Sequence, residues 1–132
     1  MTRSSNKDHY QVLILGGGTA GITVAAQLKR KLKVYDVAII EPSTKHYYQP
    51  LWTLVGAGVF PKEQSEREEA NFIPKGADWI QDSVAELQPE QNCVVTQSGN
   101  RITYDFLVVA LGIQIDWNKI PGLVEGVGRQ QI

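Results

Sequence analysis

The strongest constraint on the fold is a glycine-rich stretch, Gly16-x-Gly18-x-x-Gly21, which lies between a strand-like and a helix-like segment. The residues before it, Gln11–Leu15, form a continuous apolar run of strand length. The residues after it, from Ile22 to Leu32, repeat small or apolar side chains at spacings of three and four, which predicts a helix. A second apolar run at 36–41 predicts another strand. Strand, helix and strand in this order predict a right-handed βαβ unit and therefore an α/β protein.

Each glycine of the loop has its own role in binding a dinucleotide. We expect Gly16 to make a tight turn at backbone angles that a side chain would forbid, and Gly18 to let a pyrophosphate approach the backbone. Gly21 lets the helix press against the sheet. The phosphates then lie on the free N–H groups at the helix start, where the helix dipole is positive. The loop, in this strand-to-helix context, predicts a nucleotide cofactor.

An acidic residue, Glu41, follows Gly21 by about 20 positions, at the carboxyl end of the second predicted strand. A carboxylate in this place accepts hydrogen bonds from the adenosine ribose hydroxyls and repels a 2′-phosphate. The alternative is an ordinary surface glutamate, which the combination with the glycine loop disfavours. FAD or NAD is therefore predicted over NADP, and the βαβ unit alone does not separate these two.

The rest of the chain predicts short strands instead of a further helix and parallel strand. Leu51–Val59 indicates a short helix or a packed loop, Glu63–Pro74 a polar exposed segment, and Gln114–Ile132 shows no clear period. Ser98-Gly99-Asn100 is a hairpin turn signal. The predicted strands are Asp78–Ile80, Ser83–Leu87, Asn92–Thr96, Ile102–Tyr104 and Phe106–Ala110, the last an apolar run typical of a fully buried parallel strand.

Composition limits the class of protein. The 132 residues fit one domain, and a net charge of -1 excludes nucleic acid as the expected partner. The single cysteine, Cys93, excludes an internal disulfide and is most simply a small buried apolar residue. No run reaches the length of a membrane-spanning helix, and the polar start is no secretory signal. We therefore expect an intracellular protein with a disordered leader at residues 1–9 and no metal site.

The residues at the end of the last predicted strand help to decide between FAD and NAD as the cofactor. Ala110-Leu111-Gly112, after a strand and a β-meander, resembles the second signature of the two-dinucleotide-binding flavoproteins, the disulfide reductases and their relatives. That family usually has Ala-Thr-Gly here, so Leu111 removes a hydroxyl and keeps Gly112. The resemblance implies a Rossmann-like three-layer FAD/NAD(P)-binding fold with a β-meander insertion. Residues 10–132 would form the N-terminal part of its FAD-binding domain.

One segment, Lys45–Gly58, closely resembles the sulfide:quinone oxidoreductases of mitochondria and related bacteria, and the resemblance extends from Tyr10 to about Val124. It implies FAD as the cofactor. The residues that it assigns to FAD, beside Gly16, Gly18, Gly21 and Glu41, are Thr19 and Ala20 at the diphosphate, Gln49 near the flavin, Val84 at the adenine, and Ala110 and Gly112 close to the cofactor. The alternative for the aromatic residues of the segment, His46, Tyr47, Tyr48 and Trp52, is core packing.

The same resemblance places the sulfide-oxidising cysteine pair beyond residue 132, so no catalytic residue is expected in this chain. The chain is then expected to be a fragment with an incomplete fold, inactive alone, from an enzyme that passes electrons from sulfide to quinone. Its membrane contact, peripheral on the inner (cytoplasmic or mitochondrial) membrane, would lie in the absent C-terminal region. The alternatives are another flavoenzyme of the superfamily, such as a type II NADH:quinone oxidoreductase, and an inactive truncated product.

Overall fold

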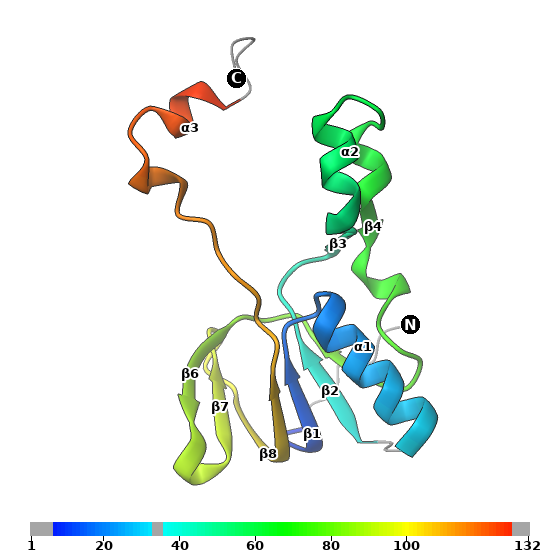
Figure 1. Ribbon diagram of the computed structural model, residues 1–132. Coiled ribbons are helices and arrows are strands. Elements are labelled where there is room, and N and C mark those ends of the chain that lie inside the picture. Colours follow the sequence, from blue (N-terminus) through cyan, green and yellow to red (C-terminus); the bar gives the residue numbers. More distant parts are fainter. Residues whose placement is uncertain (1–6, 33–35, 128–132) are drawn as a thin grey trace.

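The computed structural model describes residues 7–32 and 36–127, which form a six-stranded sheet with one helix on it and two projecting segments (Figure 1). The strand order is β5-β2-β1-β8-β7-β6. The strands are β1 (His9–Leu15), β2 (Val37–Ile40), β5 (Asp78–Ile80), β6 (Val84–Gln88), β7 (Cys93–Thr96) and β8 (Arg101–Val109). This mixed α/β sheet, in which parallel pairs dominate, confirms the predicted fold class.

The parallel part of the sheet is centred on β1, which pairs with β2 on one side and with β8 on the other. The third parallel pair, β2 with β5, was not expected, because Asp78–Ile80 was predicted to belong to the run of short strands. The strand adds to the sheet beside β2 without a preceding long helix. The Trp79 side chain of β5 also holds this strand beside β2, because its Nε1 donates a hydrogen bond to the Glu41 carbonyl oxygen at 2.9 Å.

The two predicted strands around Asp105 are one continuous strand, β8, which pairs antiparallel with β7 at its start and parallel with β1 along its length. The prediction that its apolar run is fully buried is wrong: Phe106 is 65% and Val109 58% exposed. On the α1 face of the sheet, Figure 1 shows that α1 lies over β1 and β2 and leaves β8 uncovered, so Phe106, which pairs with Val12 on that face, is exposed. Val109 pairs with Leu15 on the opposite face and is exposed there. Within the apolar run, Leu107 and Val108 pack against the core.

The helix after the glycine loop, α1 (Thr19–Gln27), continues into a π-helical turn at Leu28–Leu32. It buries Ala25 against alternate residues of β1 and β2, which point to one face of the sheet. The opposite face has a second cluster built around Leu13, Leu15 and Tyr104. Cys93 in β7 is buried as predicted, at 1% exposure. The core therefore lies on both faces of β1, directly below the loop that ends it.

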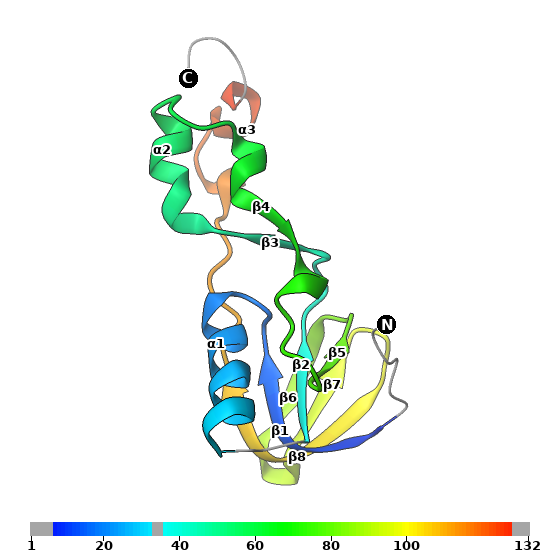
Figure 2. The same cartoon turned by 90° about the vertical axis from the view of Figure 1, so that its right-hand side faces the viewer.

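A projecting arm, residues 45–71, rises from the carboxyl end of β2 (Figure 2). It contains the antiparallel pair β3 (Lys45–Tyr47) and β4 (Glu66–Glu68), the short helix α2 (Trp52–Gly56) and short 3₁₀ turns. The helix agrees with one of the two expectations for 51–59. The prediction of an exposed segment at 63–74 is wrong in part, since Ser65 and Glu69 are buried.

The two ends of the described chain differ in how they attach to the sheet. The expected disordered leader falls largely on residues 1–6, which lie outside the described residues. Lys7 forms an ion pair with Asp36, and Asp8 accepts a hydrogen bond from the Thr103 N–H at 2.8 Å, so attachment to the sheet begins before residue 10. At the other end, an extended tail leads to α3 (Leu123–Gly126); residues 128–132 lie outside the described part.

Candidate functional site

The glycine loop lies where the parallel strands β1, β2 and β8 end. Hydrogen bonds join the end of β1 and the start of the loop to the ends of the other two strands. The Gly16 N–H donates to the Ile40 carbonyl at 2.8 Å, and the Ala110 N–H donates to the Leu15 carbonyl at 2.8 Å. The chain leaves β1 toward β2 on one side, and β8 occupies the other. In α/β sheets, ligands bind outside the carboxyl ends of the strands where strand order changes direction, and the glycine loop lies at such a place.

Gly16 and Gly21 are required by the backbone itself. Gly16 has φ +100°, and a Cβ there would lie 2.4 Å from the Ala110 carbonyl oxygen. A Cβ on Gly21 would lie 1.9 Å from the Gly16 carbonyl oxygen, which is backbone and cannot turn aside. Both positions therefore admit only glycine, and Gly21 lets α1 start directly against the loop.

Gly18 is different, because a Cβ there would have no heavy atom within 4 Å and its φ of −68° is ordinary. The fold therefore does not explain a glycine at this position. The open space in front of it is the space that the predicted diphosphate would fill. Of the three glycines of the motif, Gly18 is therefore the one that a ligand would require and the fold does not.

The start of α1 offers backbone donors beside this space. The Ile22 N–H donates to the Gly18 carbonyl at 3.1 Å, which closes the first turn, and no side chain caps this end. The N–H groups of Thr19 and Ala20 precede that turn and have no partner within the helix. With the positive end of the helix dipole, they form an anion site suited to a diphosphate.

Glu41 follows β2 and is held by the loop. Its Oε2 accepts the Gly17 N–H at 2.7 Å, and its Oε1 accepts the Ser43 N–H at 2.8 Å. Each carboxylate oxygen can accept a second hydrogen bond. The side chain is therefore fixed in one orientation and still has acceptor sites for two ribose hydroxyls.

A second acidic side chain at this loop, Glu69, was missed by the sequence analysis. It is 1% exposed, and its Oε2 lies 3.3 Å from Nδ1 of His46, whose ring stacks on Phe72 with 4.7 Å between centroids. Burial raises the pKa of the Glu69 carboxyl; His46 lowers it in part and the charge of Glu41 raises it further. In the sequence Glu69 is one of several acidic residues in a polar run, and no pattern separates it from the others.

The remaining predicted residues lie in different elements of the chain and differ in exposure. Ala110 contacts it directly, and Gly112 follows with φ +72° and open space beside it. Val84 begins β6 and packs against the core cluster that contains Leu15. Gln49 is exposed, in a 3₁₀ turn of the arm. The roles of these side chains toward FAD stay predictions.

The aromatic residues of the arm divide into two groups. His46 is buried, which agrees with the core-packing alternative for this residue. Tyr47, Tyr48 and Trp52 are exposed, and Tyr47 packs edge-on against Trp52 with 6.4 Å between ring centroids. Core packing within this chain therefore does not account for those three side chains.

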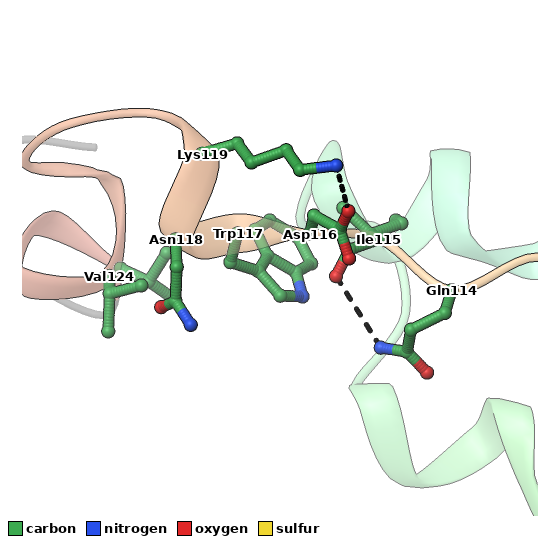
Figure 3. A pocket seen from close by; sticks show the side chains of 8 residues that line it. Gln114, Ile115, Asp116, Trp117, Asn118, Lys119 and Val124 are labelled. Carbon is green, nitrogen blue, oxygen red and sulfur yellow. Dashed lines mark hydrogen bonds and ion pairs between the residues drawn. The ribbon is translucent and has the colours of Figure 1, made fainter.

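A hollow of about 760 Å³ lies away from the glycine loop, along the tail (Figure 3). It is lined by Gln114–Lys119 with Val124 and Val127, and an ion pair of 2.5 Å joins Lys119 to Asp116. No residue of the sheet or of α1 contributes, and Ile113 next to it is 94% exposed. A hollow formed by one short stretch of chain has no rigid support, so we place the candidate site at the glycine loop.

The described ranges 7–32 and 36–127 lack two further classes of feature. No helix there is long and apolar enough to cross a membrane. No group of three or more His, Cys, Asp or Glu side chains there could hold a metal ion.

Comparison with known families decides the affiliation. The family described as pyridine nucleotide-disulphide oxidoreductase matches residues 10–132. The chain belongs to this family. Membership in the pyridine nucleotide-disulphide oxidoreductases confirms the resemblance found in the sequence and supports FAD as the cofactor.

Relatives within this family cover nearly all of the chain. It is 53% identical over 126 residues to the mitochondrial sulfide:quinone oxidoreductase of Mus musculus, which covers 96% of this chain and 28% of that protein. It is 28% identical to an external alternative NAD(P)H-ubiquinone oxidoreductase of Solanum tuberosum, covering 87% of this chain and 22% of the relative. The chain thus spans less than a third of the length of these relatives.

Two solved structures have a similar fold. The sulfide:quinone oxidoreductase of Aquifex aeolicus matches with a TM-score of 0.69 and 26% identity, over 82% of this chain and 25% of that one. A chain of the Tetrahymena thermophila mitochondrial ATP synthase assembly matches with a TM-score of 0.84 and 23% identity, over 97% and 31%. This second likeness is of the fold alone.

Proposed function

We propose that this chain forms the FAD-binding part of a flavin-dependent sulfide:quinone oxidoreductase, which oxidises sulfide and passes the electrons to quinone. The observation that carries the proposal is the 53% identity over 126 residues to the mitochondrial sulfide:quinone oxidoreductase of Mus musculus. The identity to the NAD(P)H-ubiquinone oxidoreductase of Solanum tuberosum is 28%, which makes NADH:quinone oxidation the second candidate.

The glycine loop fits the cofactor. The diphosphate would lie in the open space at Gly18 and accept hydrogen bonds from the N–H groups of Thr19 and Ala20. Glu41 would accept those of the adenosine ribose, since the loop already fixes its orientation. Bound FAD supplies two-electron transfer chemistry. These residues bind and orient the cofactor and move no proton.

The remaining contacts would be made farther from the loop. Val84 would meet the adenine with its backbone, and Ala110 and Gly112 would pass beside the cofactor, where Gly112 leaves open space. Gln49, exposed on the arm, would lie toward the flavin ring. Exposed Tyr48 and Trp52 on the same arm would then be covered by the rest of the enzyme.

The chain itself supplies no thiol for sulfide. Its single cysteine, Cys93, is buried in β7, and a buried thiol surrounded by apolar side chains is unreactive. We therefore propose that the sulfide-oxidising cysteine pair lies outside these 132 residues and that the chain alone is inactive. The relatives are named as mitochondrial, and we propose a peripheral place on the inner membrane for the enzyme.

A chimera tests the proposal. This chain would replace the matching segment of the Mus musculus enzyme, and flavin content and quinone reduction would be measured with sulfide and, separately, with NADH. We expect a yellow protein that reduces quinone with sulfide and not with NADH. A flavin-containing chimera without sulfide activity, next to an active parent enzyme, refutes the function, and a colourless folded chimera refutes the FAD site.

A further inference from the structure

Glu69 is unusual among the acidic side chains of the protein. Its Oε1 is the one buried side-chain polar atom, within the part of the chain that the structure describes, that has no hydrogen-bond partner. A buried polar group without a partner loses its hydration without compensation, and a charged group loses more. Such a group in a folded protein therefore calls for a physical explanation.

The position of the unpaired oxygen points to the glycine loop. A Cβ added to Gly17 would lie 2.5 Å from Glu69 Oε1 and 2.6 Å from Glu41 Cγ, so both acidic side chains pack against the same glycine. Gly17 donates its N–H to Glu41, the predicted ribose ligand. Any side chain at position 17 would displace one acid or both. Glycine at position 17 therefore allows both acidic side chains to pack against the loop.

Glu69 itself belongs to the arm, and its other contacts are with β3 and the residue that precedes it. Its backbone N–H donates to the Thr44 carbonyl at 2.9 Å, and its Oε2 meets His46 at 3.3 Å. His46 belongs to β3 and is held by the stacked ring of Phe72. Glu69 thus contacts the loop with one oxygen and the arm with the other. The same arm carries Gln49.

We propose that Glu69 is a positioning residue of the dinucleotide site, which docks the arm on Gly17 and keeps Glu41 and the glycine loop in the shape that receives the ribose and diphosphate. The identity of the ligand rests on the proposed function. The link between loop and arm concerns only residues of this chain.

The protonation state of Glu69 follows from its surroundings. Burial raises its pKa, and the titratable groups that face it are His46 on β3 and Glu41 at the end of β2. A proton on Glu69 removes the repulsion between two carboxylates at one glycine. Ionisation at higher pH would place two negative charges at Gly17 and push the loop and the arm apart. Positioning by Glu69 is therefore effective in its protonated form.

The first test is an NMR titration of the 132-residue chain. The carboxyl carbon of Glu69 and the amide of Gly17 would be followed with pH, with exposed Glu90 as the internal reference. We expect the pKa of Glu69 to lie above its usual value of 4.5, and the Gly17 amide to follow the same transition. In Glu69→Gln this Gly17 transition disappears, and in the matched control Glu90→Gln it stays.

The second test measures the FAD affinity of the chimera with the Mus musculus enzyme by flavin fluorescence below and above the Glu69 transition. We expect a loss of roughly fivefold or more in the wild type and a flat profile in Glu69→Gln. A packing role alone would give the variant and the wild type the same profile.

The outcomes separate the two proposals. If Glu69 titrates at its usual pKa, or if Gly17 does not follow it, the positioning role is overturned; the wild-type titration decides this without any substitution. If the chimera fails to bind FAD at every pH while Gly17 follows Glu69, the link between loop and arm stands and the proposed FAD site of this chain falls.

Discussion

The substitution Gly18→Val separates a glycine that the fold needs from one that the ligand needs. A Cβ at Gly18 meets no heavy atom within 4 Å, and φ is −68°, an angle that valine adopts without strain. Gly18 is the residue that precedes α1, and an apolar side chain there costs about 1 kcal/mol of helix capping. We therefore expect the variant to fold with nearly the stability of the wild type.

The effect on the cofactor is much larger. The valine side chain fills the space through which the diphosphate must approach the N–H groups of Thr19 and Ala20. A hydrogen bond to a charged group is worth about 1.5 to 3 kcal/mol, so loss of both costs about 3 to 6 kcal/mol. This corresponds to a roughly 10²- to 10⁴-fold weaker affinity for FAD.

The assay is flavin retention in the chimera with the Mus musculus enzyme, together with urea unfolding of the 132-residue chain. Gly21→Ala is the matched control, because its Cβ would lie 1.9 Å from the Gly16 carbonyl oxygen. We expect Gly21→Ala to destabilise the fold and Gly18→Val to spare it. A Gly18→Val chimera that purifies with full flavin content refutes the phosphate site.

Three further predictions concern the acidic residues and the activity. Glu41→Ala should weaken FAD retention by about 1 to 3 kcal/mol in the chimera, as for loss of a charged hydrogen bond, and unchanged affinity contradicts the ribose contact. The raised pKa of Glu69 means that the folded chain holds this proton more tightly than the unfolded chain, so stability is fully present below the usual pKa of 4.5 and falls as pH rises through the folded-state pKa. Urea unfolding across pH should show this fall in the wild type and not in Glu69→Gln; equal profiles contradict it. The chain alone, mixed with FAD, sulfide and a short-chain quinone, should reduce quinone no faster than a flavin-only control, and faster turnover would show that the chemistry lies within it.

The sequence alone predicts the parts of the structure that depend on local signals. Gln11–Leu15, the glycine loop and the following helix lie next to one another in the chain, and each limits the conformation of the next. Gly16 and Gly21 could be assigned because backbone geometry requires them. The same local logic placed Glu41 at the end of β2, beside the loop.

Contacts between distant segments could not be predicted in this way. The approach of Glu69 to Gly17 depends on the path of the whole arm, and an acidic run gives no periodic signal for one buried member. Similarly, the apolar run of β8 indicates a strand correctly and does not show that α1 leaves one end of it uncovered. Burial depends on which element lies on top, and that element is remote in sequence.

The place of β8 beside β1 determines the order in which the protein can be assembled during synthesis. β1 is synthesised before β8, and the two paired residues His9 and Thr103 are 94 positions apart in the chain. Closing so long a loop is entropically costly and slows folding. Until β8 is made, one edge of β1, a strand with five buried residues, stays unpaired and open to association with other nascent chains. A chaperone that acts on the growing chain would therefore find its target in β1.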